Sequence, residues 1–134
     1  MANKQRGFVE IELGGKTYEI RLGTNEMASL DAALGRSFLS ILAEGQVGIH
    51  VLRQAIYEGL ADYRRRNLGA KLTPQKIGQM MEPAKLEYYA DKIIEALEAA
   101  GWIAPEGEDE AAAKGDGDAD PTGGESRGFE ETDL

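Results

Sequence analysis

The sequence predicts an α+β fold that is mainly helical, with an N-terminal β-hairpin followed by four to five α-helices. Two observations predict this class. Apolar and charged residues alternate in two short runs around Gly14-Gly15, and apolar residues recur at steps of three and four from about residue 24 onward. A third observation divides the chain, because residues 105–134 hold 11 acids and 2 bases and so carry the whole net charge of −9. We therefore expect a hairpin-plus-helices domain over residues 1–104 and a disordered acidic tail over residues 105–134.

The runs 9–13 and 17–22 predict the two strands of the hairpin. Each run has one apolar face and one charged face, as expected for a ribbon that packs on one side only. Gly14 and Gly15 can take the positive φ angles that a two-residue turn requires. The outer edges of such a ribbon carry unpaired backbone groups that recruit another strand, unless the charged residues on the wet face prevent it.

The first three predicted helices follow the hairpin directly. Thr24 or Asn25 can cap a helix that stops at Gly35, and Ser37 can cap a short second helix that ends near Gly45. A third helix is expected from about 47 to 66, with an apolar stripe that faces the core. The members of this stripe are Ile49, Leu52, Ile56, Leu60 and Tyr63.

Two more helices complete the predicted domain. Thr73-Pro74 is a capping residue followed by proline at the first helical position, and it opens a short helix. Glu82-Pro83 restarts the chain into a last helix that stops at Gly101, after which Trp102 is expected to pack back on the last turn. The main stripe of this helix is predicted to hold Leu86, Ala90, Ile93, Leu97 and Ala100, with Tyr89 and Ile94 beside it.

No set of residues in the sequence has the pattern of a catalytic or metal site. The chain has no cysteine, and its one histidine, His50, is expected to be a surface or boundary residue near the start of the third helix. The pairs Glu58/Asp62 and Glu95/Glu98 have the spacing of neighbours on a helix face, but a solvated face has the same pattern. We expect no enzyme activity, no cofactor and no metal.

Alternating aspartates in the tail have the spacing of the first ligands of a calcium loop. They are Asp116, Asp118 and Asp120. Counted from Asp116, position 6 holds Pro121 where such a loop needs glycine, and position 12 holds Arg127 where it needs glutamate. The sequence therefore argues against a calcium site.

The residues expected to contact a partner are aromatic side chains and methionines on or beside the apolar stripes. Tyr88 and Tyr89 are consecutive, so a helix separates them by about 100° and only one can point inward. In the tail, Phe129 and Leu134 are the only large apolar residues. The full predicted set is Tyr18, Tyr57, Tyr63, Met80, Met81, Tyr88, Tyr89, Phe129 and Leu134.

One basic run, Arg64-Arg65-Arg66, stands at the predicted end of the third helix, where cations suit the helix dipole. The alternative is that this run docks an acidic segment, including the chain's own tail. Because the folded part has no net charge, we expect no nucleic-acid partner.

No run approaches the ~20 apolar residues of a membrane span, and the polar residues 1–6 lead into no signal-peptide core. We therefore expect an intracellular protein with no membrane partner.

The order and spacing of the segments resemble a known family. Residues 15–22 read Gly-Lys-x-Tyr-x-Ile-Arg-Leu, and Thr24-Asn25 and a helix ending Leu34-Gly35 follow. A helix with Ala-Ile-Tyr-Glu-Gly-Leu at 55–60 comes next, then Leu-Thr-Pro at 72–74 and a short helix through Ile-Gly at 77–78, and finally a helix ending Ile-Glu-Ala-Leu at 94–97. Over roughly residues 7–101 this pattern resembles the tail assembly chaperones of long-tailed bacteriophages and of gene transfer agents.

The resemblance implies a non-enzymatic protein of the bacterial host's cytoplasm. Members of this family bind the tape-measure protein, keep its long hydrophobic helices soluble, recruit tail tube subunits, and are absent from the mature virion. Many are also made in a longer form by ribosomal frameshifting.

Two other functions remain open from the sequence. One is a structural component of the phage tail or its connector, and the other is an acidic inhibitor of a host DNA-binding protein. The tyrosines and the hairpin edges also allow a homo-oligomer.

Overall fold

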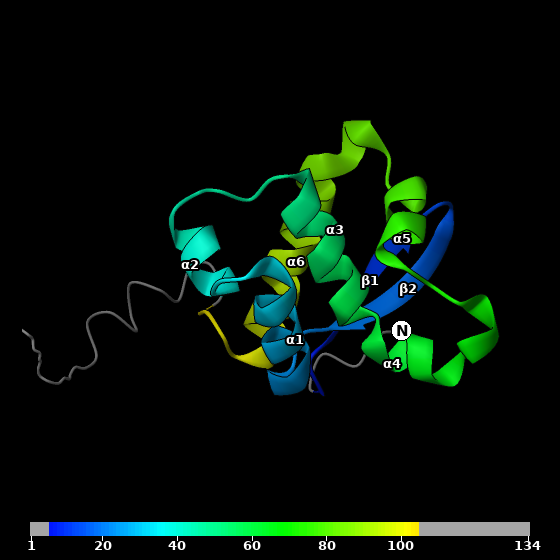
Figure 1. Ribbon diagram of the computed structural model, residues 1–134, viewed down its shortest axis with the longest axis horizontal. Helices are drawn as coiled ribbons and strands as arrows, with labels where there is room; N and C mark the ends of the chain where they lie inside the picture. Colours follow the sequence, from blue (N-terminus) through cyan, green and yellow to red (C-terminus); the bar gives the residue numbers. More distant parts are fainter. Residues whose placement is uncertain (1–5, 105–134) are drawn as a thin grey trace, which may run out of the picture. The chain divides into compact units, whose positions relative to one another are not determined.

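The computed structural model describes residues 6–104, which form an antiparallel hairpin followed by helices (Figure 1). The strands are β1 (Phe8–Leu13) and β2 (Lys16–Arg21). The helices are α1 (Thr24–Leu34), α2 (Phe38–Ala43), α3 (Ile49–Gly59), α4 (Ala61–Arg66), α5 (Pro74–Met80) and α6 (Leu86–Ala100), with short 3₁₀ turns η2 (Leu68–Ala70) and η3 (Pro83–Lys85). This arrangement confirms the predicted class. The acidic tail, with its predicted disorder, lies outside the described residues.

The hairpin forms where the alternation predicted it. Gly14 and Gly15, with φ of 59° and 81°, make the two-residue turn. The register pairs Val9 with Ile20 and brings the apolar side chains onto one face. The buried side chains of this face are Val9, Ile11, Leu13 and Ile20.

Helices cover the apolar face of the hairpin and flank its strands. α6 packs on β1, α4 packs on β2, and α3 lies against α1, α5 and α6 (Figure 1). The hairpin turn reaches the end of α5, where the Gly14 N–H donates to the Met80 carbonyl at 3.1 Å. α1 and α2 lie at the opposite end, away from the turn (Figure 1). The largest fully buried side chains of the helices are Leu30, Phe38, Ile56, Ile77, Tyr89, Ile93 and Leu97.

Two predicted helix caps are confirmed and one is wrong. Ser37 Oγ accepts a hydrogen bond from the N–H three residues on at 3.2 Å, and Thr73 Oγ1 does the same at 3.1 Å. α1 begins at Thr24 itself, after Gly23, and no side chain caps it. The fully buried Leu22 fixes the point where the chain leaves the hairpin, so the helix starts before either predicted cap can serve.

The single helix predicted over 47–66 is two helices. α3 ends at Gly59 and α4 starts at Ala61, with Leu60 at φ −89° and ψ 15° between them. A Cβ on Gly59 would lie 3.1 Å from the Ile20 Cβ, so this glycine lets the helix approach β2 closely at the break. The predicted stripe also fails at its first member, because Ile49 is 61% exposed.

The core face of α6 is rotated from the one predicted. Its buried residues are Tyr89, Ile93, Ala96 and Leu97. Leu86, Ala90 and Ala100, which were predicted on the main stripe, are half-buried. The hydroxyl of Tyr89 explains part of this rotation, because it accepts the Glu82 N–H at 2.7 Å and so holds the ring beneath the start of the helix.

Trp102 closes the unit that begins with the hairpin. Its backbone N–H donates to the Leu97 carbonyl at 2.9 Å, which confirms that it folds back on the last turn of α6. Its indole Nε1 donates to the Leu22 carbonyl at 2.6 Å. The end of the last helix is therefore joined to the exit of the hairpin.

Candidate functional site

The predicted contact residues do not share one surface. Tyr18 and Tyr63 meet edge to face, with ring centroids 5.1 Å apart, where β2 contacts α4. The ring of Tyr57 lies under the guanidinium of Arg64, 4.0 Å from its centroid. All three tyrosines are half-buried and have partners within the chain. Phe129 and Leu134 lie outside the described residues.

Tyr88 and Tyr89 point in different directions, as the helical geometry predicted, and the hydroxyl of each is engaged in a hydrogen bond within the chain. Tyr89 is fully buried, so its prediction as a contact residue is wrong, and it belongs to the core. The Tyr88 hydroxyl accepts the Glu12 N–H at 2.9 Å. In this register the Glu12 N–H points away from β2, so Tyr88 occupies part of the outer edge of β1. That part of the edge cannot recruit another strand.

The two methionines face different surroundings. Met80 lies beneath the hairpin turn, and its Sδ accepts the Tyr18 hydroxyl at 3.8 Å. Met81, one residue on, lines a groove described below. Both side chains are half-buried.

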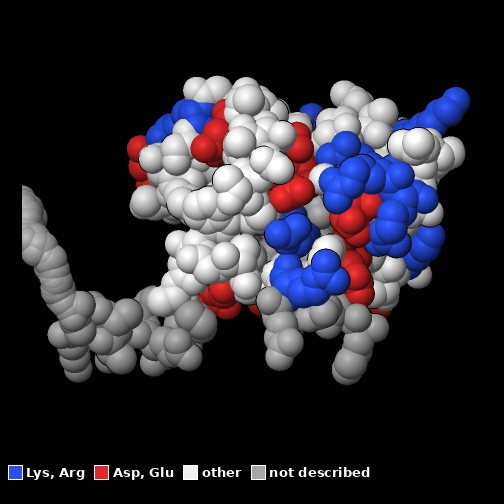
Figure 2. Space-filling model, turned by 90° about the horizontal axis from the view of Figure 1, so that it is seen from below, with Lys and Arg blue, Asp and Glu red and all other residues white. Residues whose placement is uncertain are grey.

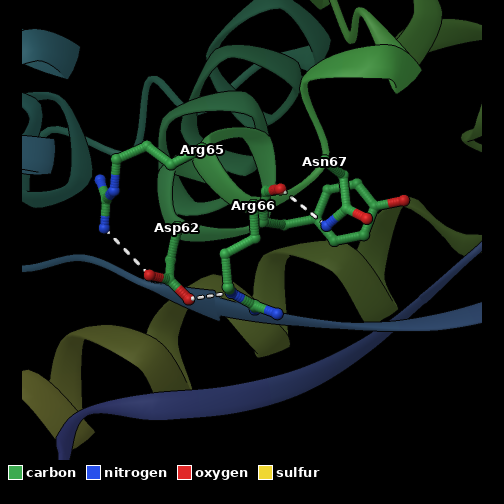
Figure 3. A network of polar contacts seen from close by, with 5 residues as sticks. Asp62, Arg65, Arg66 and Asn67 are labelled. Carbon is green, nitrogen blue, oxygen red and sulfur yellow. Dashed lines mark hydrogen bonds and ion pairs between the residues drawn. The ribbon is translucent and has the colours of Figure 1, made fainter.

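Acidic side chains of the same chain engage the basic run at the end of α4. Arg65 and Arg66 each lie 3.0 Å from an oxygen of Asp62 (Figure 3). Arg64 lies 3.8 Å from Glu58. Figure 2 shows the same pattern on the surface, with Lys and Arg side chains gathered at one side and acidic side chains among them. These contacts favour helix termination as the role of the run, and they also place Glu58 and Asp62 in ion pairs.

An apolar groove lies between the first turn of α3, helix α5 and the start of α6. Its cavity volume is about 400 Å³. The lining residues are Ile49, Arg53, Gln75, Gly78, Gln79, Met81, Pro83 and Leu86. Ile49 is the most exposed of these large apolar side chains and leaves much of its surface in water. Two other cavities, of about 310 and 340 Å³, are bordered mainly by polar residues and glycines or alanines.

Arg53 crosses this groove over Gly78. A Cβ on Gly78 would lie 3.2 Å from the Arg53 Cδ, so the glycine makes room for the arginine stem. The Arg53 Nε is buried and has no hydrogen-bond acceptor among the described residues. A buried N–H without an acceptor is rare in folded proteins and costs about 1–3 kcal/mol. The groove thus combines exposed apolar surface with an arginine whose Nε has no acceptor.

Most of the groove was not anticipated from the sequence. Ile49 and Leu86 were predicted on buried stripes, Arg53 was not singled out, and Gly78 was named only as part of the family pattern. Gly78 was the one usable sign, because a glycine inside a short helix marks a close approach.

Within residues 6–104, no group of three or more His, Cys, Asp or Glu side chains is placed to hold a metal ion. In the same part of the chain, no helix has the length and apolar character needed to cross a bilayer. His50 is exposed, as predicted. No family model matches the chain, and no curated protein or solved structure matches it.

Proposed function

We propose that this chain is a non-enzymatic tail assembly chaperone that binds the tape-measure protein and recruits tail tube subunits. The apolar groove between α3, α5 and α6 is the structural observation that carries the proposal. The ordered sequence resemblance over residues 7–101 supports it independently. A chaperone of this kind needs a surface for amphipathic helices, and the groove offers one.

The groove suits a helix better than an extended segment. Its walls are helices, whose backbone groups are largely bonded within the helices themselves. A partner bound as a β-strand needs a sheet edge to satisfy its backbone, whereas a helical partner satisfies its own and offers side chains alone. An apolar face of residues at i, i+3, i+4 and i+7 could then cover Ile49, Met81 and Leu86.

Co-expression with the tape-measure protein encoded beside this chain tests the proposal. We expect the tape-measure protein to become soluble and to co-purify with the full chain. The proposal fails if the tape-measure protein remains insoluble and unbound. Mass spectrometry of purified particles adds a check, because a chaperone should be absent, whereas a stoichiometric amount would show a structural tail component.

A pair of neighbouring variants ties this test to the groove. Ile49→Asp places a charge on the apolar lining, so we expect co-purification to fall about tenfold or more. His50→Asp adds the same charge one residue on, in an exposed position that does not line the groove. Both acids lie in the first turn of α3, where the helix dipole favours them, so stability should change little in either variant. If Ile49→Asp and His50→Asp lost co-purification equally, the tape-measure protein would not bind in the groove.

A further inference from the structure

Charge distinguishes the groove from an ordinary apolar surface. Of its eight lining residues, Arg53 alone is charged, two are glutamine amides, and none is acidic. A partner that buries this surface also shields Arg53 from water. A shielded guanidinium without an acceptor is strongly unfavourable, so the surface selects a partner that brings an acceptor.

Arg53 is free of the contacts that hold a comparable arginine on the continuation of the same helix. Arg64 donates from Nε to the Tyr57 carbonyl at 3.3 Å, lies 3.8 Å from Glu58, and covers the Tyr57 ring. The side chain of Arg53 has no hydrogen bond or ion pair within residues 6–104. Turning the Arg53 guanidinium toward a partner therefore breaks no polar contact of the described chain.

We infer that Arg53 is the specificity-determining residue of this groove and selects an amphipathic helix with a carboxylate within its apolar face. The planar guanidinium can bind a carboxylate through two parallel hydrogen bonds, and once the side chain has turned toward the partner these bonds can include the Nε that is without an acceptor in the free chain. The apolar residues on either side of the acid cover Ile49, Met81 and Leu86. The inference rests on the proposed function for the identity of the partner, but not for the chemistry of the site.

A matched pair of peptides tests this chemistry directly. Both are amphipathic helices of about 20 residues, ~30 Å long, with the same leucine face. One carries a single glutamate in the middle of that face, and the other carries glutamine there. We expect the full chain to bind the glutamate peptide about 10- to 100-fold more tightly, as measured by calorimetry at low and moderate salt.

Variants of Arg53 test whether this residue causes the preference for the glutamate peptide. Arg53→Met keeps the stem and removes the guanidinium, so the preference for glutamate should disappear while the leucine face still binds. Arg53→Lys keeps the charge but not the two-pronged geometry and should retain only part of the preference. Arg36→Met is the control, because Arg36 pairs with Glu44 and does not line the groove. Thermal melts verify that all three variants are folded.

The outcomes separate this inference from the proposed function. Equal binding of the two peptides, a preference that survives Arg53→Met, or no binding of either peptide overturns the inference. If the tape-measure protein co-purifies equally well with Arg53→Met, the inference fails for that partner and the chaperone function stands. If the peptides show the Arg53-dependent preference but the tape-measure protein does not co-purify, the function fails and the site stands.

Discussion

The two ends of helix α3 meet opposite environments. Ile56, near the C-terminal end, is fully buried, whereas Ile49, seven residues earlier on the same predicted stripe, is 61% exposed. Gly59 packs closely on Ile20 of the hairpin, whereas the arginine stem of Arg53, nearer the start of the helix, packs on Gly78 of α5. Both ends of the helix therefore contribute to the core, since Val51 and Leu52 are buried as well, but at its start Ile49 leaves apolar surface exposed.

This difference between Ile49 and Ile56 shows that the periodicity of a helix indicates which residues share an apolar face, but not which of them another element covers. Both isoleucines satisfy the same spacing. The end of α3 contacts β2 through Gly59, which lies against Ile20, whereas Ile49 at its start is left exposed. An apolar stripe that extends past its cover leaves apolar surface in water without any change in pattern.

The largest expected effect compares the two isoleucines. Ile56→Ala should lower the free energy of unfolding by about 2–5 kcal/mol, because it leaves a cavity in a close-packed core. Ile49→Ala should change it by no more than about 0.5 kcal/mol. Chemical denaturation of both variants measures the contrast. A large loss for Ile49→Ala would mean that the groove is closed in solution.

A second comparison uses the two glycines. Gly59→Ala places a methyl group 3.1 Å from the Ile20 Cβ and should cost about 1–3 kcal/mol, because β2 cannot move aside. Gly78→Ala places one 3.2 Å from the Arg53 Cδ, but that side chain is flexible and can shift. Alanine also has the higher helix propensity, so Gly78→Ala should be neutral or stabilising by up to about 1 kcal/mol. Denaturant unfolding distinguishes the two variants, provided that the dependence of the free energy on denaturant concentration is the same in both. Similar losses of stability at both positions would show that Arg53 is held rigidly.

The smallest expected effect compares the two arginines. Arg53→Met should leave the free energy of unfolding unchanged or raise it by up to about 1 kcal/mol, because it removes a buried N–H that has no acceptor. Arg64→Met should lower it by about 0.5–1.5 kcal/mol through loss of its ring contact and its ion pair. Thermal denaturation at neutral pH measures the stability of both variants. If Arg53→Met lowered the free energy of unfolding, this would contradict the idea that Arg53 costs stability and serves binding instead.

Local chemistry made most of the fold predictable. The Gly14-Gly15 turn, the Ser37 and Thr73 caps and the stop at Gly101 follow from the conformational preferences of those residues alone. The class and the order of the elements follow from them. The break at Leu60 did not, because it depends on the contact of Gly59 with a strand about 40 residues earlier.

The groove was harder to predict because it depends on which apolar residues remain uncovered. Nothing in the local sequence separates Ile49 from Ile56, or Tyr88 from Tyr89, until the neighbouring elements are in place. The unsatisfied Nε of Arg53 is likewise a property of the assembled helices. The tyrosines were predicted as contacts for their chemistry, and the fold instead uses Tyr88 and Tyr89 to bind backbone N–H groups.

The hydrogen bond from Trp102 to the Leu22 carbonyl has a consequence for the timing of synthesis. The two residues are 80 positions apart, so a ribosome that adds about 5–20 residues per second needs roughly 4–16 s to make the second after the first. During that interval the apolar face of the hairpin has no α6 to cover it. The apolar residues of β1 therefore lack their α6 cover for seconds during synthesis, and a ribosome-associated factor that meets the chain then encounters a different surface from that of the finished protein.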